Sequence, residues 1–554
     1  MSKTITSSTT GPILLSASDN PLIITDHGSV AASGAGADGI DAPAGATWAI
    51  RNAGTVISAS AFGMSLASSG MVTNAGSISG IDGLGLSAGG IVVNQSRGSI
   101  TGNGAGGTGF GSGSGVYITG APGQVTNRGV ITGIGYGVAL AAGGIVTNHG
   151  SILGGEDGVE IRGAPGSVVN DSTIKASVDD GVALFAGGSV SNSKNASISG
   201  AGANGAGVFI TGGVGTVTNR GNISSGGSNL GILLTGGGTI SNAASATVSG
   251  GSTGVFVSGG AGSLQNNGQV TATGTTGVDF EAGGSVTNTA QGTISGSSFG
   301  VFLGGGSGNV TNAGTISGGV DAVLFGNGGP DRVVVKPTAV FHGSVVGNSS
   351  PGNTIELAGG RGTITGAAGV SGTITENANS WSFSNFDTLA VSRGGSWTFR
   401  GPNSVQTVLN NGTVGVTGAL NVAIIDPASA GIFQLAGGSL EVGAAIGSDT
   451  KMQFLGNGNE LILDDVTAFG NHVGTPAAAR PLLENFGLGD AVDLKQFTAA
   501  PDLMLDFNRG TGNLQVSNDT QVANLSFQRS SLGPGSFHAN GDGATGVLIT
   551  HSLS

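Results

Sequence analysis

A phrase of the form V-T-N-x-G-x-I-S-G recurs along this chain and constrains its fold more than any other feature. One copy spans residues 310–318. Most copies follow each other at intervals of 20 to 24 residues, with longer intervals of 33 and 27 after Asn94 and Asn192. Its Asn recurs as Asn52, Asn74, Asn94, Asn127, Asn148, Asn170, Asn192, Asn219, Asn242, Asn266, Asn288 and Asn312. Repetition at this period is typical of a solenoid in which one repeat makes one turn.

Composition alone is compatible with a low-complexity chain, because 112 of 554 residues are Gly and only 9% are charged. Val, Ile and Leu nevertheless return at fixed places in each repeat, which a disordered chain does not show. The length does not require several globular domains, since solenoid rungs pack only on their neighbours. We therefore expect one ordered core that extends along the stacked rungs.

Each rung carries three short strand signals separated by Gly or Asn: V-T-N, I-S-G, and a G-V-x-[ILF] segment such as residues 207–210. Strands of three to five residues plus corners account for a circuit of this length. No helical period of ten residues is present in this region. The sequence thus predicts an all-β fold, a parallel β-helix (β-solenoid) with about 20–24 residues per rung, right-handed, with a C-terminal cap region.

Composition and repeat pattern divide the chain into four segments. Residues 1–45 are expected to form an N-terminal cap or lead-in, and residues 46–325 the regular solenoid with its Asn ladder. Residues 326–480 lose the phrase but keep Gly-rich strands and turns, which indicates a less regular solenoid. Residues 481–554 are more acidic and are expected to form a C-terminal cap and secretion region.

The repeated Asn has a structural explanation. Asn tolerates the left-handed conformation at a corner, and stacked Asn amides can hydrogen-bond from rung to rung. We therefore assign Asn74, Asn148, Asn170, Asn192, Asn219, Asn242, Asn266, Asn288 and Asn312 to a structural ladder and not to a ligand site.

The turn before V-T-N alternates between a longer form, such as residues 163–166, and a shorter Ala-Gly-Gly form, such as residues 186–188. The outward residue of G-V-x-[ILF] follows this alternation, and on longer-turn rungs it is aromatic at Tyr117, Phe209, Phe256 and Phe302. Such a column could be a stacking track that binds a polymer. The alternative is that a loop or the C-terminal segment covers it.

Acidic residues suggest one alternative function. Asp179 and Asp180 precede a strand, and Glu156, Asp157, Glu160 and Asp171 lie one rung away. Paired carboxylates hydrolyse glycosidic bonds, and β-helix polysaccharide hydrolases use such Asp pairs. The pattern departs from that family, because Asn-His-Gly at 148–150 precedes the Asp pair and no basic residue-x-Lys motif follows it. Solvated acidic corners are the simpler account, so we expect no enzyme.

The sequence contains few motifs that could bind a metal ion. Residues 326–334 match the RTX calcium nonapeptide G-G-x-G-x-D-x-U-x except that Asn327 replaces the second Gly, which makes Asp331 a Ca²⁺ candidate. The copy is single, so a plain turn is the favoured interpretation. The six His lie far apart without zinc-ligand spacing. We expect no cofactor, with Ca²⁺ as the one metal to test.

The net charge of −13 argues against nucleic acid or an anionic membrane as partner. No run reaches 18 apolar residues, so no transmembrane segment is expected. The N-terminus lacks the apolar region of a signal peptide. Cysteine is absent, which suits an extracellular chain without disulfides.

The rungs, such as residues 300–318, resemble the β-helical passenger repeats of bacterial autotransporter and adhesin-like proteins. Residues 486–550 look like the C-terminal region of repeat proteins exported by type I secretion, which carry a C-terminal signal. The resemblance implies a secreted or cell-surface adhesin, surface-layer or matrix protein. Its expected partners are a surface polysaccharide or other copies of itself, with assembly into an oligomer or fibre.

Overall fold

The computed structural model describes residues 2–104, 110–203, 205–444, 446–447, 449–465 and 481–553. The chain is an all-β, parallel β-solenoid of about 20 turns, which confirms the predicted fold class. It divides into two compact units. Unit 1 contains residues 1–306 and 316–320, and unit 2 contains residues 307–315 and 321–554.

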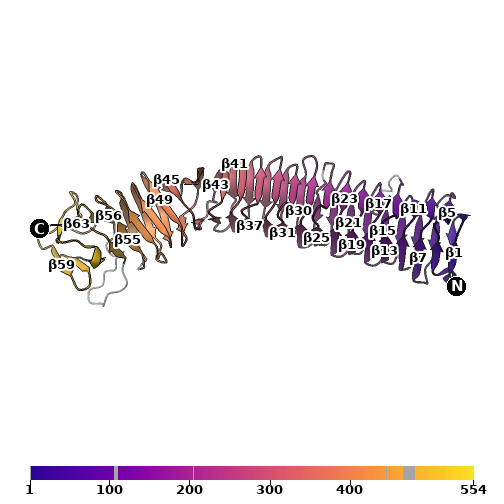
Figure 1. Cartoon of the computed structure of the whole chain (residues 1–554), viewed down its shortest axis with the longest axis horizontal. Coiled ribbons are helices and arrows are strands. Elements are labelled where there is room, and N and C mark those ends of the chain that lie inside the picture. The colour runs from indigo at the N-terminus through magenta and orange to yellow at the C-terminus, as the bar shows by residue number, and fades with distance from the viewer. Residues whose placement is uncertain are drawn as a thin grey trace. The chain divides into compact units, whose positions relative to one another are not determined.

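Strands at the same place in successive coils pair in parallel and form three sheets along unit 1, one for each strand signal of the repeat. Figure 1 shows the stacked coils from the side. Sheet 1 carries V-T-N and runs from β1 (Lys3–Ile5) and β4 (Leu22–Ile24) through β7 (Trp48–Asn52) to β37 (Gly284–Asn288). Sheet 2 carries I-S-G and runs from β2 (Ser8–Thr10) and β5 (Ser29–Ala32) to β38 (Thr293–Gly296). Sheet 3 carries G-V-x-[ILF] and runs from β3 (Ile13–Leu14) and β6 (Ile40–Ala42) to β39 (Phe299–Leu303).

The repeat fixes the register of these sheets. In sheet 1, β10 (Gly70–Asn74) pairs with β13 (Gly90–Asn94) so that Val72 lies beside Val92 and Asn74 beside Asn94. Alternation along the strand buries Val72 and Asn74 and turns Thr73 outward. Each coil therefore contributes a few fully buried aliphatic side chains to a core that extends along the stack.

Residues of the expected lead-in already belong to the coil. β1 pairs in parallel with β4, β2 with β5 and β3 with β6. The next coil follows in the same arrangement, because β4 pairs with β7. The apolar residues of 1–45 thus start the stack directly.

The Asn column is a continuous hydrogen-bond ladder. Each Nδ2 donates to the Oδ1 of the Asn one coil later, over 2.8 to 3.0 Å from Asn52 to Asn288. The ladder starts at Asn52, whose Oδ1 has no partner among the described residues because Ile24 occupies its place in the preceding coil. One expectation was wrong: no ladder Asn among the described residues has a positive φ, since each ends a strand in extended conformation.

The shorter and longer turns differ in the backbone conformation of their Gly residues. Shorter turns contain two successive Gly residues with positive φ, such as Gly187 (75°) and Gly188 (133°), whereas longer turns contain one, such as Gly163 (79°). A Cβ at Gly188 would collide with the carbonyl oxygen of Gly166, so only Gly fits. The repeating unit of the backbone is therefore a pair of coils.

Unit 2 continues as a less regular solenoid. One parallel column contains β40 (Gly308–Asn312), β42 (Arg332–Val335), β44 (Thr354–Leu357), β48 (Thr388–Val391), β50 (Asn403–Asn410), β52 (Ala419–Ile425), β54 (Ser439–Ala444), β56 (Glu460–Leu463) and β58 (Ala491–Leu494). A second contains β45 (Arg361–Gly369), β49 (Ser396–Arg400), β51 (Thr413–Val416), β53 (Ile432–Leu435), β55 (Lys451–Phe454), β57 (Leu482–Glu484) and β61 (Val522–Phe527). An antiparallel insertion interrupts this order, because β46 (Ser371–Glu376) pairs with both β45 and β47 (Asn379–Ser384).

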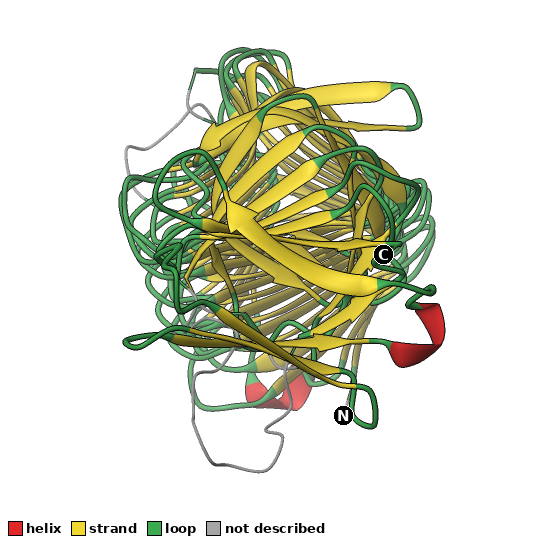
Figure 2. Ribbon diagram, turned by 90° about the vertical axis from the view of Figure 1, so that its left-hand side faces the viewer, coloured by secondary structure: helices red, strands yellow, loops and turns green. Residues whose placement is uncertain are grey.

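The last strands of unit 2 pair antiparallel. β59 (Met504–Asn508) pairs with β60 (Asn513–Ser517) and β60 with β61, while β63 (Val547–Ser552) pairs with β58 and β62 (Ser536–Gly541). Helix in the described residues is limited to the 3-10 turns η1 (Ala17–Asp19) and η3 (Arg529–Ser531), red in Figure 2. Among the residues placed by the structure, no helix has the length and apolar character needed to span a membrane.

Candidate acidic and aromatic site on sheet 3

The outward residues of sheet 3 form one column in register. Pairing of β15 (Val116–Ile118), β18 (Val138–Leu140), β21 (Val159–Ile161), β24 (Val182–Leu184) and β27 (Val208–Ile210) places their middle residues side by side. The same column continues to later coils and reads Tyr117, Ala139, Glu160, Ala183, Phe209, Leu233, Phe256, Asp279 and Phe302. We call it the sheet 3 column.

Two aromatic pairs and one Arg surround the middle of this column. Phe110 meets Tyr117 edge-on with ring centroids 5.8 Å apart, and Phe185 meets Phe209 edge-on at 5.6 Å. The guanidinium of Arg162 lies 4.3 Å from the ring centre of Phe110 and 4.8 Å from that of Phe185. Cation–π attraction of this kind holds the two aromatic pairs against one cation.

A pocket of about 310 Å³ opens beside Arg162. Its lining consists of Tyr136, Glu156, Asp157, Glu160, Arg162, Asp179, Asp180, Phe185, Phe209 and Leu233. Glu160 is buried and pairs with Arg162. The pocket therefore combines a wall of aromatic rings with an acidic floor.

A recurrent corner contact explains why Asp157 and Asp180 lie at the floor. Each Asp precedes the Gly that opens a sheet 3 strand, and its Oδ1 accepts a hydrogen bond from a backbone N–H one coil later. Asp157 accepts from the N–H of Asp180 at 2.8 Å, and Asp180 from that of Ala206 at 2.6 Å. The same contact occurs in earlier coils, from Phe62 to Asp38 at 3.0 Å and from Ser114 to Asp82 at 2.8 Å.

What distinguishes this site is that two such corners follow each other. One carboxylate oxygen each from Asp157, Asp179 and Asp180 lies within 4.8 Å of the others. Asp157 and Asp180 are buried, at 5% and 7% exposure, while Asp179 is half-buried. In the described residues this is the one group of three acidic or His side chains placed to hold a metal ion.

The environment disfavours negative charge here. Burial raises the pKa of Asp180 to about 8, and the charges of Asp179 and Glu160 add to the effect. Burial also moves the pKa of Asp157 far above its usual range, helped by the hydrogen bond shared with Glu160 and by the charge of Asp180. The pKa of Asp179 is raised by burial and by the charge of Glu156. Burial and mutual repulsion therefore favour protonation of part of the cluster, or binding of a cation to it.

The arrangement offers three kinds of chemistry. The rings present flat apolar surfaces, Arg162 and the carboxyl groups present hydrogen-bond donors and acceptors, and a protonated Asp beside another carboxyl group is the pairing that glycosidases use. Oxygen ligands also suit Ca²⁺, although that ion normally takes six to eight of them.

The structure brings together some of the residues predicted from sequence. Asp179, Asp180 and Phe209 line the pocket, and Tyr117 lies next to it through Phe110. Phe256 and Phe302 belong to the same column in later coils and do not line the pocket. All four column aromatics are half-buried.

Asp331, the Ca²⁺ candidate, lies apart from this site in unit 2. It is buried, and its Oδ1 accepts a hydrogen bond of 2.8 Å from the N–H of Gly308. Its own N–H donates to Asn353 at 2.8 Å. Burial raises the pKa of Asp331 to about 6. These contacts tie neighbouring coils, and no cluster of three acidic or His ligands includes Asp331 in the described residues.

Sequence reasoning did not select Phe110, Tyr136, Arg162 or Phe185. Two features of the sequence point to Phe110 and Tyr136. Phe110 lies in the interval of 33 residues between Asn94 and Asn127, so the longest insertion in the repeat supplies the ring that packs against Tyr117 and Arg162. Tyr136 stands before Gly137, the position that Asp occupies at the acidic corners.

A scan of protein families finds none whose model matches this chain, and a search of curated proteins finds no relative. The class of protein is therefore given by the fold: a parallel β-solenoid.

Proposed function

We propose that this chain is a secreted or cell-surface β-solenoid that adheres to a polysaccharide along sheet 3. The observation that carries the proposal is the sheet 3 column, in which Tyr117, Phe209, Phe256 and Phe302 recur in register. Coils are spaced about 4.8 Å apart, so Phe209, Phe256 and Phe302, which lie two coils apart, recur about every 10 Å. Tyr117 lies four coils before Phe209, because Glu160 occupies the intermediate place. Aromatic rings at such intervals suit a linear polymer of sugar rings.

Groups beside the column favour a carbohydrate over an apolar polymer. Sugar rings have apolar C–H faces that stack on aromatic rings and hydroxyls that need polar partners. Arg162 and the acidic floor supply donors and acceptors close to Phe209. Contact at several coils would give binding by avidity even where each single contact is weak.

Substitution of the column tests the adhesion. Replacing Phe209, Phe256 and Phe302 together with Ala is expected to lower retention on a panel of immobilised bacterial and plant polysaccharides by more than tenfold, because each lost ring contact is worth about 1 kcal/mol. Ile145→Ala is the matched control, since Ile145 is a 46% exposed apolar residue of sheet 1. Unchanged retention in the triple variant, with the circular dichroism spectrum preserved, would refute the column as the binding surface.

A second candidate function is polysaccharide cleavage, and the acidic cluster favours it. Asp180 remains protonated near neutral pH and would act as general acid, while the more exposed Asp179 would act as the second carboxyl group. Oxygen separations within 4.8 Å are shorter than inverting glycosidases require, so a retaining outcome is expected.

Release of reducing ends from the same polysaccharide panel tests cleavage. Activity in the wild-type chain that disappears in Asp179→Asn and Asp180→Asn, but not in Asp82→Asn, would establish an enzyme. Asp82 is a suitable control because it makes the same corner hydrogen bond and is absent from the cluster. A wild-type chain that releases no reducing ends from any polymer excludes this candidate.

A further inference from the structure

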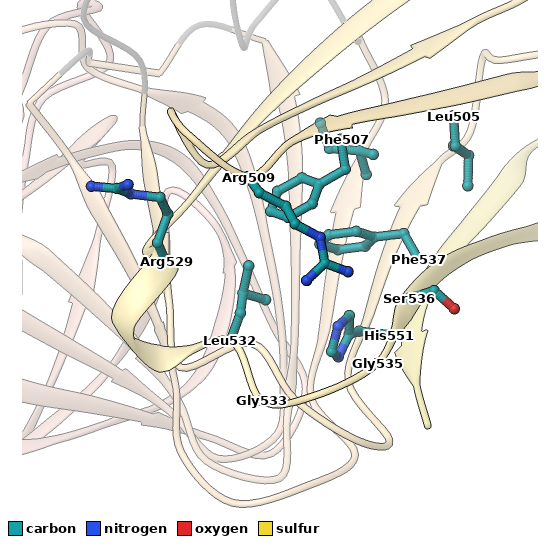
Figure 3. A pocket seen from close by; sticks show the side chains of 11 residues that line it. Leu505, Phe507, Arg509, Arg529, Leu532, Gly533, Gly535, Ser536, Phe537 and His551 are labelled. Carbon is teal, nitrogen blue, oxygen red and sulfur yellow. The ribbon is translucent and has the colours of Figure 1, made fainter. Parts of the chain in front are cut away.

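A cavity of about 440 Å³ lies among the antiparallel strands at the end of unit 2 (Figure 3). Residues of β59, β60, η3, β62 and β63 and of the loops between them line it, among them Leu505, Phe507, Arg509, Leu532, Phe537 and His551. The volume falls within the range of pockets that hold small organic molecules.

The apolar walls of this cavity are incompletely covered. On β59, Leu505 and Phe507 point to one face and are only half-buried, while Met504, Asp506 and Asn508 on the other face are exposed. On β62, Phe537 is also half-buried. A strand normally buries its apolar face against the core, so these faces leave room for an apolar occupant.

An aromatic cluster holds the cavity wall in place. The ring centroid of Phe537 lies 4.9 Å from that of Phe507, 4.8 Å from that of Phe527 and 5.1 Å from that of His551. Packing of this density restrains each ring. The wall is therefore preformed and does not need an occupant to assemble it.

The polar side of the cavity is positive. The guanidinium of Arg509 points into the space beside Phe537 and His551, whereas that of Arg529 points away (Figure 3). No lining residue is Asp or Glu, and no ion pair of Arg509 occurs within the described part of the chain. Burial and then the charges of His538 and Arg509 lower the pKa of His551.

Three other basic side chains of unit 2 have carboxylate partners among the described residues. Arg332 pairs with Glu356. Lys495 pairs with Glu441 and with Asp464, and Lys451 pairs with Glu484 at 3.2 Å. Arg509, in contrast, faces the cavity without a carboxylate among the described lining residues (Figure 3), and its charge favours an anionic occupant.

We propose that this cavity binds a small amphipathic organic anion, with its apolar body against Phe507 and Phe537 and its carboxylate or sulfonate head on Arg509. Bidentate hydrogen bonds from a guanidinium suit such a head group. The ring of His551 lies on the same side of the cavity as the guanidinium of Arg509 (Figure 3) and offers a further hydrogen-bonding group. This site is independent of the polymer-binding column on sheet 3.

Fluorescence titration of the full chain with anilinonaphthalene sulfonate tests the site. This probe joins an aromatic body to an anionic head and becomes fluorescent in apolar surroundings. Saturable binding to one site is expected, and Arg509→Gln should weaken it by about tenfold or more, since a hydrogen bond to a charged group is lost. Arg400→Gln, which removes an exposed Arg outside the cavity, should bind as the wild type does.

A neutral analogue separates the role of charge from that of the apolar wall. N-phenylnaphthylamine has the same aromatic body without the sulfonate, so its affinity should be unaffected by Arg509→Gln. Leu532→Asp should weaken the sulfonate probe because it places a carboxylate in the lining. Absence of saturable binding by the wild type, or equal affinity of Arg509→Gln and Arg400→Gln for the sulfonate, would overturn the proposal.

Discussion

The same carboxylate corner has different consequences in different coils. Asp82 caps the N–H of Ser114 with no other carboxylate of the cluster beside it, whereas Asp157 and Asp180 cap successive coils and lie together. Asp residues that accept backbone hydrogen bonds at a corner therefore form a carboxylate cluster when they occur in two successive coils. Burial then raises the pKa of both side chains.

Asp180 makes stability depend on pH. Its folded pKa of about 8 lies above the usual Asp value, so the folded state keeps a proton that the unfolded chain releases above about pH 4. This contribution is fully present below about pH 4 and is lost as the pH rises toward 8. Asp180→Asn should therefore raise the thermal midpoint at about pH 8 relative to wild type, with a smaller or opposite effect at about pH 4.

Circular dichroism melts across this pH range measure the effect. Asp82→Asn controls for loss of the corner carboxylate itself. Parallel pH profiles for wild type and Asp180→Asn would show that Asp180 ionises normally in the folded chain.

The Asn ladder predicts a local loss of stability when one member is removed. In Asn170→Ala, the Oδ1 of Asn192 loses its donor and the Nδ2 of Asn148 loses one acceptor. An unsatisfied buried amide costs about 1–3 kcal/mol. Hydrogen exchange should rise in the coils around residue 170 first, because solenoid stability depends on contacts between neighbouring coils.

Asn222→Ala is the control for this prediction, because Asn222 is an exposed Asn on sheet 2. Equal exchange in the two variants would mean that the amide ladder contributes little. The unpartnered Oδ1 of Asn52 shows that the fold tolerates one such group at the start of the ladder.

Single residues of the candidate site were only partly predictable. Asp179, Asp180 and Phe209 stand at repeat positions whose direction follows from strand alternation. Phe110 and Phe185 lie in turns and insertions, where no periodicity fixes the direction of a side chain. Their approach to Arg162 depends on the path of those loops.

At the scale of elements, paired Gly residues define the shorter turns. Gly188→Ala should destabilise the coils around it by several kcal/mol, because φ of 133° is strained for Ala and its Cβ would collide with Gly166. Gly226→Ala should be close to neutral, since an added Cβ there meets no atom within 4 Å. Limited proteolysis and thermal melts compare the two variants; equal stability would show that the shorter turn adapts to a side chain.

For the whole molecule, charge restricts the partners. A net charge of −13 makes association with nucleic acid unfavourable, because such binding depends on neutralising phosphates with Lys and Arg. At physiological salt the chain should not retard double-stranded DNA or single-stranded RNA in gel electrophoresis. Retardation that disappears with added salt would reveal a basic surface that the net charge conceals.

The repeat by itself determined the architecture of this protein. Val, Ile and Asn at fixed places in each circuit can be buried together only by stacking coils, so fold class and ladder followed from periodicity. The tertiary structure decided which outward residues meet. It placed two carboxylate corners in one pocket with Arg162, Phe185 and Phe209, and it left Arg509 facing an apolar cavity. Those contacts depend on insertions and on the capping strands, where the repeat and its register no longer specify neighbours.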